Sequence, residues 1–210
     1  MRNPVEVFVD KYRQEAYVYF DKNICELPRK ESGEFNESGG GMQNNDADAF
    51  RHAYVSGVMT QIFSEPISEK MGLVVEWRGK NPENQKNMDL WNNSVGRKYG
   101  KQANTKEELA DFLKQALENG ELILSLDDLR KYEGKTSLQI DDEKPVVVLK
   151  ENETGRNEVF LNLLKGEVMD REAFVSSIEG GEYSGYNIAS INNIATPISK
   201  PDQVSSNNLG

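Results

Sequence analysis

Hydrophobic residues recur at three- and four-residue steps through the first 120 residues of the chain, which is the spacing of helices with one buried face. The pattern predicts five helices, most of them bounded by a capping residue, a proline or a glycine. The second is apolar on nearly every side between Ala49 and Phe63, as expected of a helix at the centre of a domain. The predicted helices cover residues 4–20, 46–63, 66–79, 82–99 and 106–119.

The pattern changes after Gly120. The stretches "KPVVVLKE" and "NEVFLNLLKG" are typical of strands, and "MDREAFVSSIEGG" predicts a short helix capped by Asp170. From Ile188 onward the chain is polar, contains two prolines and shows no period, which predicts an extended or disordered tail. A glycine-rich polar run, residues 29–45, predicts a mobile loop before the second helix.

These elements predict a mainly α protein with three parts. A bundle-like helical domain would occupy residues 1–134 and carry the functional site. A small mixed α+β extension would follow over residues 135–187, and residues 188–210 would form a polar flexible tail.

Composition excludes several classes of protein. The chain has 210 residues and a net charge of −10, which argues against a protein that wraps a nucleic acid but leaves open a nuclease with a local basic cleft. No apolar run approaches the ~20 residues of a transmembrane helix, and charged residues interrupt the N-terminus before any signal-peptide core. We therefore expect a cytoplasmic protein, or one exported by a specialised secretion system. The oligomeric state is left open.

Candidate chemistry begins in the second helix, "DADAFRHAYVSGVMT", which holds the only histidine of the chain. Asp48 and His52 are one helical turn apart, so the carboxylate can orient the imidazole and fix its tautomer. Arg51 points to another side of the helix, and it needs a carboxylate partner if it is buried.

The fourth helix carries polar residues along one face. This face begins at Asp89 and continues with Asn92, Asn93 and Gly96, which follow Asp89 by three, four and seven residues. Arg97 follows Asn93 by one turn. Such groups on a core helix must line a site or join a hydrogen-bond network. Gly96 weakens the helix by roughly 1 kcal/mol against alanine, which indicates a close approach to its backbone.

Glu76 follows the apolar run "GLVV" and is a third candidate. Desolvation there would raise its pKa and suit it to acid–base chemistry, whereas a solvated helix-end glutamate is the alternative. His52, Glu76 and Asp89 are the residue types of an acid–base or metal-assisted hydrolase. Asn92, Asn93 and Arg97 suit the binding of an anion. The lone histidine excludes histidine-rich zinc sites but leaves Mg²⁺ or Ca²⁺ open.

Two motifs, "DADAFRHAYVSGVMT" and "EWRGKNPENQKNMDLWNNSVGRKYG", resemble a bacterial domain family of unknown function. Its pattern is Asp-Ala-Phe/Tyr-Arg-His-Ala followed by Asp-Leu-x-Asn-Asn-x-Val-Gly-Arg. Such domains occur at the C-terminal ends of Rhs-type polymorphic toxins and as free-standing proteins. The resemblance covers residues 45–132, and its polar positions fall on Asp48, Arg51, His52, Glu76, Asp89, Asn92, Asn93 and Arg97.

The resemblance implies an enzyme that damages a cell component, paired with an immunity or secretion partner protein. Relatives often have His-Glu where this chain has Val75-Glu76, so a two-histidine metal site would lack one ligand here.

Two hypotheses follow. In the first, the chain is an antibacterial hydrolase acting on a lipid, a cell-wall precursor or a nucleotide. His52 is its general base, held by Asp48 or Asp89, and Arg51 joins the substrate-binding residues. In the second, the same residues form a buried structural network in a non-catalytic binding or interaction protein.

Overall fold

A computed structural model describes residues 4–24, 45–79, 81–202, 204, 208 and 209, with the side chains of residues 4–8, 77 and 78 left undescribed. The described chain contains six helices and two small antiparallel sheets, which confirms the mainly α fold with a small α+β extension. The predicted mobile loop lies almost wholly outside the described residues. The elements are α1 (Pro4–Asn23), α2 (Asp46–Ile62), α3 (Glu65–Gly79), α4 (Glu83–Gly100), α5 (Lys106–Glu118), β1 (Val146–Glu151), β2 (Asn157–Asn162), β3 (Glu167–Asp170), α6 (Arg171–Glu179), β4 (Tyr186–Ile191) and β5 (Ile194–Ser199).

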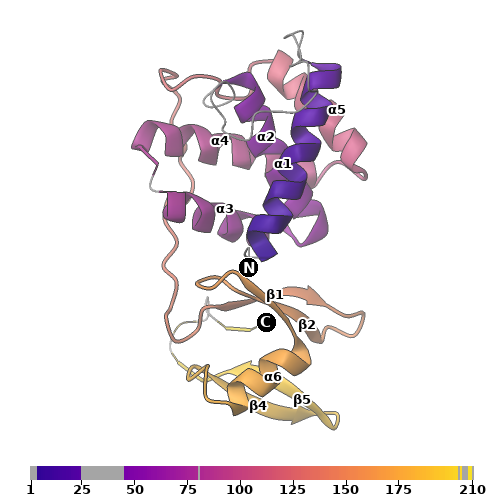
Figure 1. The fold of residues 1–210 in the computed structure, drawn as a ribbon, viewed down its shortest axis with the longest axis vertical. Helices are drawn as coiled ribbons and strands as arrows, with labels where there is room; N and C mark the ends of the chain where they lie inside the picture. Colours follow the sequence, from indigo (N-terminus) through magenta and orange to yellow (C-terminus); the bar gives the residue numbers. More distant parts are fainter. Residues whose placement is uncertain (1–3, 25–44, 80, 203, 205–207, 210) are drawn as a thin grey trace. The chain divides into compact units, whose positions relative to one another are not determined.

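The chain divides into two compact units. The helical unit is Phe8–Leu138, and the second unit is Gln139–Gly210 together with Met1–Val7. Figure 1 shows the helices of the first unit and the strands of the second, coloured along the chain.

Helix α2 is the centre of the helical unit, as its all-round apolar pattern predicts. It packs against α3, α4 and α5. The centroid of its Phe50 ring also lies 5.7 Å from those of Tyr19 and Phe20 on α1. The side chains of Phe50 and Val58 have no exposed surface. Burial on every side holds α2 in place, so the polar groups that it carries have fixed positions.

Helices α2 and α4 approach each other most closely at three glycines. A Cβ atom on Gly96 would collide with the carbonyl oxygen of Ala53, and one on Gly100 would lie 2.5 Å from the carbonyl oxygen of Gly57. The sequence indicated a close approach to the Gly96 backbone, and the group that makes it is the backbone of α2. This contact sets the face of α4 that carries Asp89 and Asn93 beside the start of α2.

The second unit has its own core. Strands β1, β2 and β3 form an antiparallel sheet in that order, and α6 packs against β2 and β3. The core holds seven buried residues: Val146, Phe160, Met169, Phe174, Tyr183, Tyr186 and Leu209.

The prediction of an extended or disordered tail from residue 188 was wrong for its first part. Strands β4 and β5 form an antiparallel hairpin in which Ile188 pairs with Pro197. Asn192 and Asn193 join the strands with φ of 54° and 59°, the left-handed conformations that a tight two-residue hairpin turn requires. The polar composition concealed the hairpin, although the Asn-Asn pair is a turn signal.

Candidate functional site

The first turns of α2 carry three polar residues of the site. Asn45 caps the helix, because its side-chain oxygen accepts a hydrogen bond of 3.1 Å from the backbone nitrogen of Asp48. Asp48 and His52 then lie one turn apart, with 3.6 Å between Asp48 Oδ1 and His52 Nε2. Both side chains are largely buried, with 2 % and 11 % exposed.

Arg51 is held by both of these neighbours. Its Nη2 atom contacts Asp48 Oδ1 and donates a 2.6 Å hydrogen bond to His52 Nε2, while Nη1 donates to the hydroxyl of Tyr17 on α1. The buried arginine therefore has the carboxylate partner that it needs. Because a guanidinium can only donate, Nε2 of His52 acts as an acceptor and has no proton of its own to give.

Helices α3 and α4 contribute two buried carboxyl groups, Glu76 and Asp89, which hydrogen-bond to each other. Asn81, between the helices, donates to Glu76 Oε2 at 3.1 Å and contacts Asp89 Oδ2 at 3.4 Å. The other oxygen of Asp89, Oδ1, lies 3.3 Å from His52 Nε2. This contact is not a hydrogen bond, because that nitrogen already accepts from Arg51 and Oδ1 has no hydrogen-bond partner among the described residues. Two acceptor atoms at this distance repel each other less when the Asp89 carboxyl is protonated than when it is ionised.

Electrostatics agree with a protonated Asp89. Burial, with the neighbouring charges of Glu76 and Asp48, raises the pKa of Asp89 to about 8. Burial also raises the pKa of Glu76, although its hydrogen bonds with Asn81 and Asp89 oppose that shift. Two carboxyl groups in one buried site cannot both ionise without a large penalty, so the pair holds one proton near neutral pH.

The imidazole of His52 is neutral. Burial lowers its pKa well below 6.5, the charges of Arg51 and Arg13 lower it further, and a hydrogen bond with Asn93 opposes them. A neutral imidazole that already accepts a hydrogen bond from Arg51 is a poor general base in this arrangement.

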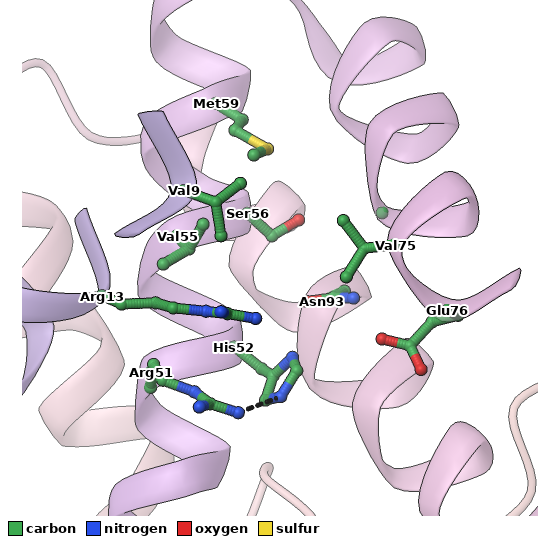
Figure 2. A pocket seen from close by; sticks show the side chains of 11 residues that line it. Val9, Arg13, Arg51, His52, Val55, Ser56, Met59, Val75, Glu76 and Asn93 are labelled. Atoms are coloured by element: carbon green, nitrogen blue, oxygen red, sulfur yellow. Dashed lines mark hydrogen bonds between the residues drawn. The ribbon is translucent and has the colours of Figure 1, made fainter. Parts of the chain in front are cut away.

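A pocket with an empty volume of about 380 Å³, including the part open to solvent, is lined by Arg51, His52 and Glu76. Asp48 and Asp89 lie behind these groups and do not line it. Figure 2 shows the two guanidinium groups on one side and the carboxyl of Glu76 on the other. The polar lining comprises Arg13, Arg51, His52, Ser56, Glu76 and Asn93. The apolar lining comprises Val9, Val55, Met59 and Val75, and Gly72 completes the wall.

Two predicted substrate-binding residues lie outside this cluster. The carboxamide of Asn92 donates to the carbonyl oxygen of Ile123 and accepts from its backbone nitrogen, both at 2.9 Å, so it ties the chain after α5 to α4. Arg97 donates to the hydroxyl of Tyr132 at 3.2 Å and lies 3.9 Å from Glu69. Neither lines the pocket.

Three residues of the site could not be recognised from the sequence. Arg13 and Tyr17 belong to α1, whose polar face resembles an ordinary solvated one, and Asn81 precedes Pro82 at the start of a helix, where an asparagine normally serves as a cap. Only the packing of α1 beside α2 brings the two α1 residues to the site. The Asn81 side chain instead bridges Glu76 and Asp89.

Asp48, His52 and Asp89 could together contact a metal ion. Each offers one ligand atom, and the three atoms lie within 4.8 Å of one another. One imidazole nitrogen with carboxylate oxygens suits a divalent transition metal ion better than Mg²⁺ or Ca²⁺, which take oxygen ligands. However, Arg51 Nη2 contacts two of these atoms and supplies positive charge there, so a bound cation would have to displace the guanidinium.

Comparison with known proteins identifies a domain but no activity. Residues 28–121 match the model of a family described as a domain of unknown function, DUF6973. The match takes in α2 to α5, and therefore every predicted site residue, whereas Arg13 and Tyr17 precede it. No curated protein and no solved structure matches the chain. None of the described helices is long and apolar enough to cross a membrane.

Proposed function

We propose that the helical unit is a hydrolase in which Glu76 transfers protons and Arg13 and Arg51 bind the anionic part of the substrate. One observation carries the proposal. The carboxyl of Glu76 lines a pocket, hydrogen-bonds to a second buried carboxyl, and faces two guanidinium groups across that pocket. Buried carboxyl pairs that share a proton are well suited to acid–base catalysis near neutral pH.

Hydrolysis requires one proton to be taken up and returned. Ionised Glu76 accepts a proton from a water molecule while the oxygen of that water attacks the electrophilic carbon or phosphorus of an ester. The same carboxyl then gives the proton to the leaving oxygen as the ester bond breaks, and the products are an acid and an alcohol. Arg13 and Arg51 stabilise the negative charge that develops on the reacting group.

Asp89 and His52 are positioning residues in this scheme. Protonated Asp89 hydrogen-bonds to Glu76 and thereby favours the ionised form of Glu76. His52 accepts from Arg51 and holds the guanidinium at the pocket. The sequence alone favours His52 as the general base. The geometry favours Glu76, because no arginine side chain among the described residues forms an ion pair with its carboxyl.

The biological role that we propose is an antibacterial toxin or effector. This part rests on the resemblance of the two sequence motifs to toxin-associated domains, and the substrate would be a component of a bacterial cell. A toxic enzyme of this kind needs an immunity or secretion partner protein.

Expression in bacteria tests the proposal. The full chain would be directed to the cytoplasm or the periplasm as wild type, Glu76→Gln, His52→Ala and Glu69→Gln. Glu69 lies on the same helix as Glu76 but does not line the pocket, which makes it the matched control. We expect the wild type and Glu69→Gln to arrest growth in one compartment and the two site variants to be harmless. A Glu76→Gln variant as toxic as the wild type would contradict the assignment.

The balance of charges in the site favours a second candidate, a purely structural role. The two positive charges of Arg13 and Arg51 are matched by Asp48 and by the single negative charge of the Glu76–Asp89 pair. Removing one partner from a buried ionic network costs about 3–5 kcal/mol. In the structural interpretation, His52→Ala and Glu76→Gln both unfold the protein or lower its melting temperature sharply. In the catalytic interpretation, Glu76→Gln retains a melting temperature close to that of the wild type, because a carboxamide replaces a carboxyl of the same shape.

A further inference from the structure

Among the described residues, neither arginine of the pocket has a full set of partners. Arg13 makes a weak ion pair, at 3.4 Å, with Asp10, whose side chain is 44 % exposed. Arg51 has Asp48 as its carboxylate partner, but its buried Nε atom has no hydrogen-bond partner among the described residues. Burial lowers the pKa of Arg13, and the charge of Arg51 lowers it further. Two neighbouring cations that repel each other in a pocket are stabilised by an anion placed between them.

The other half of the pocket is aliphatic. Figure 2 shows Val9, Val55 and Met59 on the side of the pocket away from Arg51 and His52. At most 8 % of each of these three side chains is exposed. Branched and thioether side chains of this kind accommodate hydrocarbon, and methionine adapts to irregular shapes. The pocket therefore has a cationic end and a hydrocarbon end.

We propose that the pocket binds a phosphate ester of an aliphatic alcohol, with the phosphate between Arg13 and Arg51 and the first carbons of the chain against Val9, Val55 and Met59. This inference rests on the proposed hydrolase and names its substrate class. A phosphate offers oxygens to both guanidinium groups at once, which a single carboxylate does less completely.

The pocket chemistry argues against a nucleotide. The only aromatic ring among the described residues that line the pocket is the imidazole of His52, which Arg51 and Asn93 already engage, so a nucleobase would have no free ring to stack on. Aliphatic phosphates come from two sources in a bacterial cell. Membrane phospholipids carry a diacylglycerol, and the lipid carriers of cell-wall synthesis carry a single isoprenoid chain.

Calorimetric titration of the full chain tests the ligand class. The Glu76→Gln variant would be used, so that binding is measured without turnover. The probes are hexyl phosphate, hexanol, inorganic phosphate and adenosine monophosphate. We expect hexyl phosphate to bind at least about tenfold more tightly than each of the other three, because only it satisfies both ends of the pocket. Stronger binding of adenosine monophosphate would overturn the proposal, and so would equal binding of inorganic phosphate or no binding of hexyl phosphate.

Variants locate the binding groups. In the same Glu76→Gln background, Arg13→Gln should weaken the binding of hexyl phosphate at least about tenfold, and Arg13→Lys should retain part of the affinity. Arg156→Gln, which removes a cation from the second unit, should change nothing. Val55→Asn should weaken hexyl phosphate but leave the binding of inorganic phosphate unaltered. An Arg13→Gln variant that stays folded by circular dichroism and binds like its parent would refute the site.

Two longer probes distinguish the source of the ligand. Geranyl phosphate represents the isoprenoid carriers, and dihexanoyl-phosphatidic acid represents the phospholipids. The probe that binds more tightly identifies the source of the ligand. If neither probe binds more tightly than inorganic phosphate, the substrate is not an aliphatic phosphate. If the esters bind but wild-type protein releases no product from either, the binding proposal stands and the hydrolase proposal fails.

Discussion

Asp89 is a carboxyl whose burial has a measurable consequence for stability. Its pKa in the folded protein is about 8, against an ordinary value of 3.8, so the folded state holds its proton over a pH range in which the unfolded chain has released it. Stability from this group is fully present below about pH 4 and is lost as the pH rises through about 8. The slope for one proton is at most about 1.4 kcal/mol per pH unit.

We predict that Asp89→Asn removes this dependence. A carboxamide resembles the protonated carboxyl and does not titrate, so the variant should gain stability relative to the wild type as the pH rises from about 5 to about 9. Urea unfolding across that range measures the difference in unfolding free energy. Asp127→Asn, at an exposed carboxyl, controls for the loss of a negative charge. A constant difference between wild type and Asp89→Asn at all pH values would mean that the carboxyl is ionised in the fold.

Residue-level prediction from sequence succeeded where the groups share one helix. The spacing of Asp48 and His52 predicts their proximity, because residues four apart lie on the same face of a helix. The contacts of Asp89 with Glu76 and His52 depend on three helices meeting, and periodicity contains no information about which helices are neighbours. Arg13 was missed for the same reason.

At the scale of elements, the glycines between α2 and α4 determine how closely the site residues approach one another. We predict that Gly96→Ala destabilises the protein by at least about 3 kcal/mol, since the new Cβ would overlap the backbone of α2 at Ala53 and neither helix can move without disturbing the core. The substitution would otherwise stabilise α4 by about 1 kcal/mol through helix propensity. Chemical denaturation gives the net change.

Gly72→Ala is the matched control for this prediction. A Cβ on Gly72 would meet only the Asn93 side-chain nitrogen at 3.5 Å, which is ordinary contact, so the propensity gain should dominate. We expect Gly72→Ala to be neutral or mildly stabilising. Equal effects of the two substitutions would show that the helices are not in backbone contact at Gly96.

Element prediction from sequence depended on local signals. The sequence offers a capping box at Thr105 and Glu108, and Asn45 or Asp46 as the cap of the second helix. In the structure the helices begin there, with Thr105 and Asn45 as the caps. The prediction missed the β4–β5 hairpin because polar residues and prolines surround its short apolar segments. Pro197 lies within β5, and a proline is tolerated in a strand only at an edge or a bulge. The hydrogen bonds between β4 and β5, rather than a buried face of alternating residues, hold this hairpin together.

The molecule as a whole contains two separate cores, one around α2 and one around β2. Because each compact unit buries its own apolar side chains, each should unfold cooperatively by itself, and a calorimetric scan should resolve two transitions. Substitutions in one core then shift one transition and leave the other unchanged.

We predict this separation for Phe160→Ala and Leu113→Ala. Phe160 is fully buried in the second unit, with its ring centroid 4.9 Å from that of Phe174, and its truncation should cost about 3–5 kcal/mol. Leu113 is fully buried in the helical unit, and its truncation should cost about 2–5 kcal/mol. Phe160→Ala should lower only the melting transition of the strand-containing unit and leave ligand binding at Arg13 intact, whereas Leu113→Ala should lower only the other transition. A single transition that moves as one in both variants would mean that the two cores unfold together, in which case the second unit contributes directly to the stability of the site.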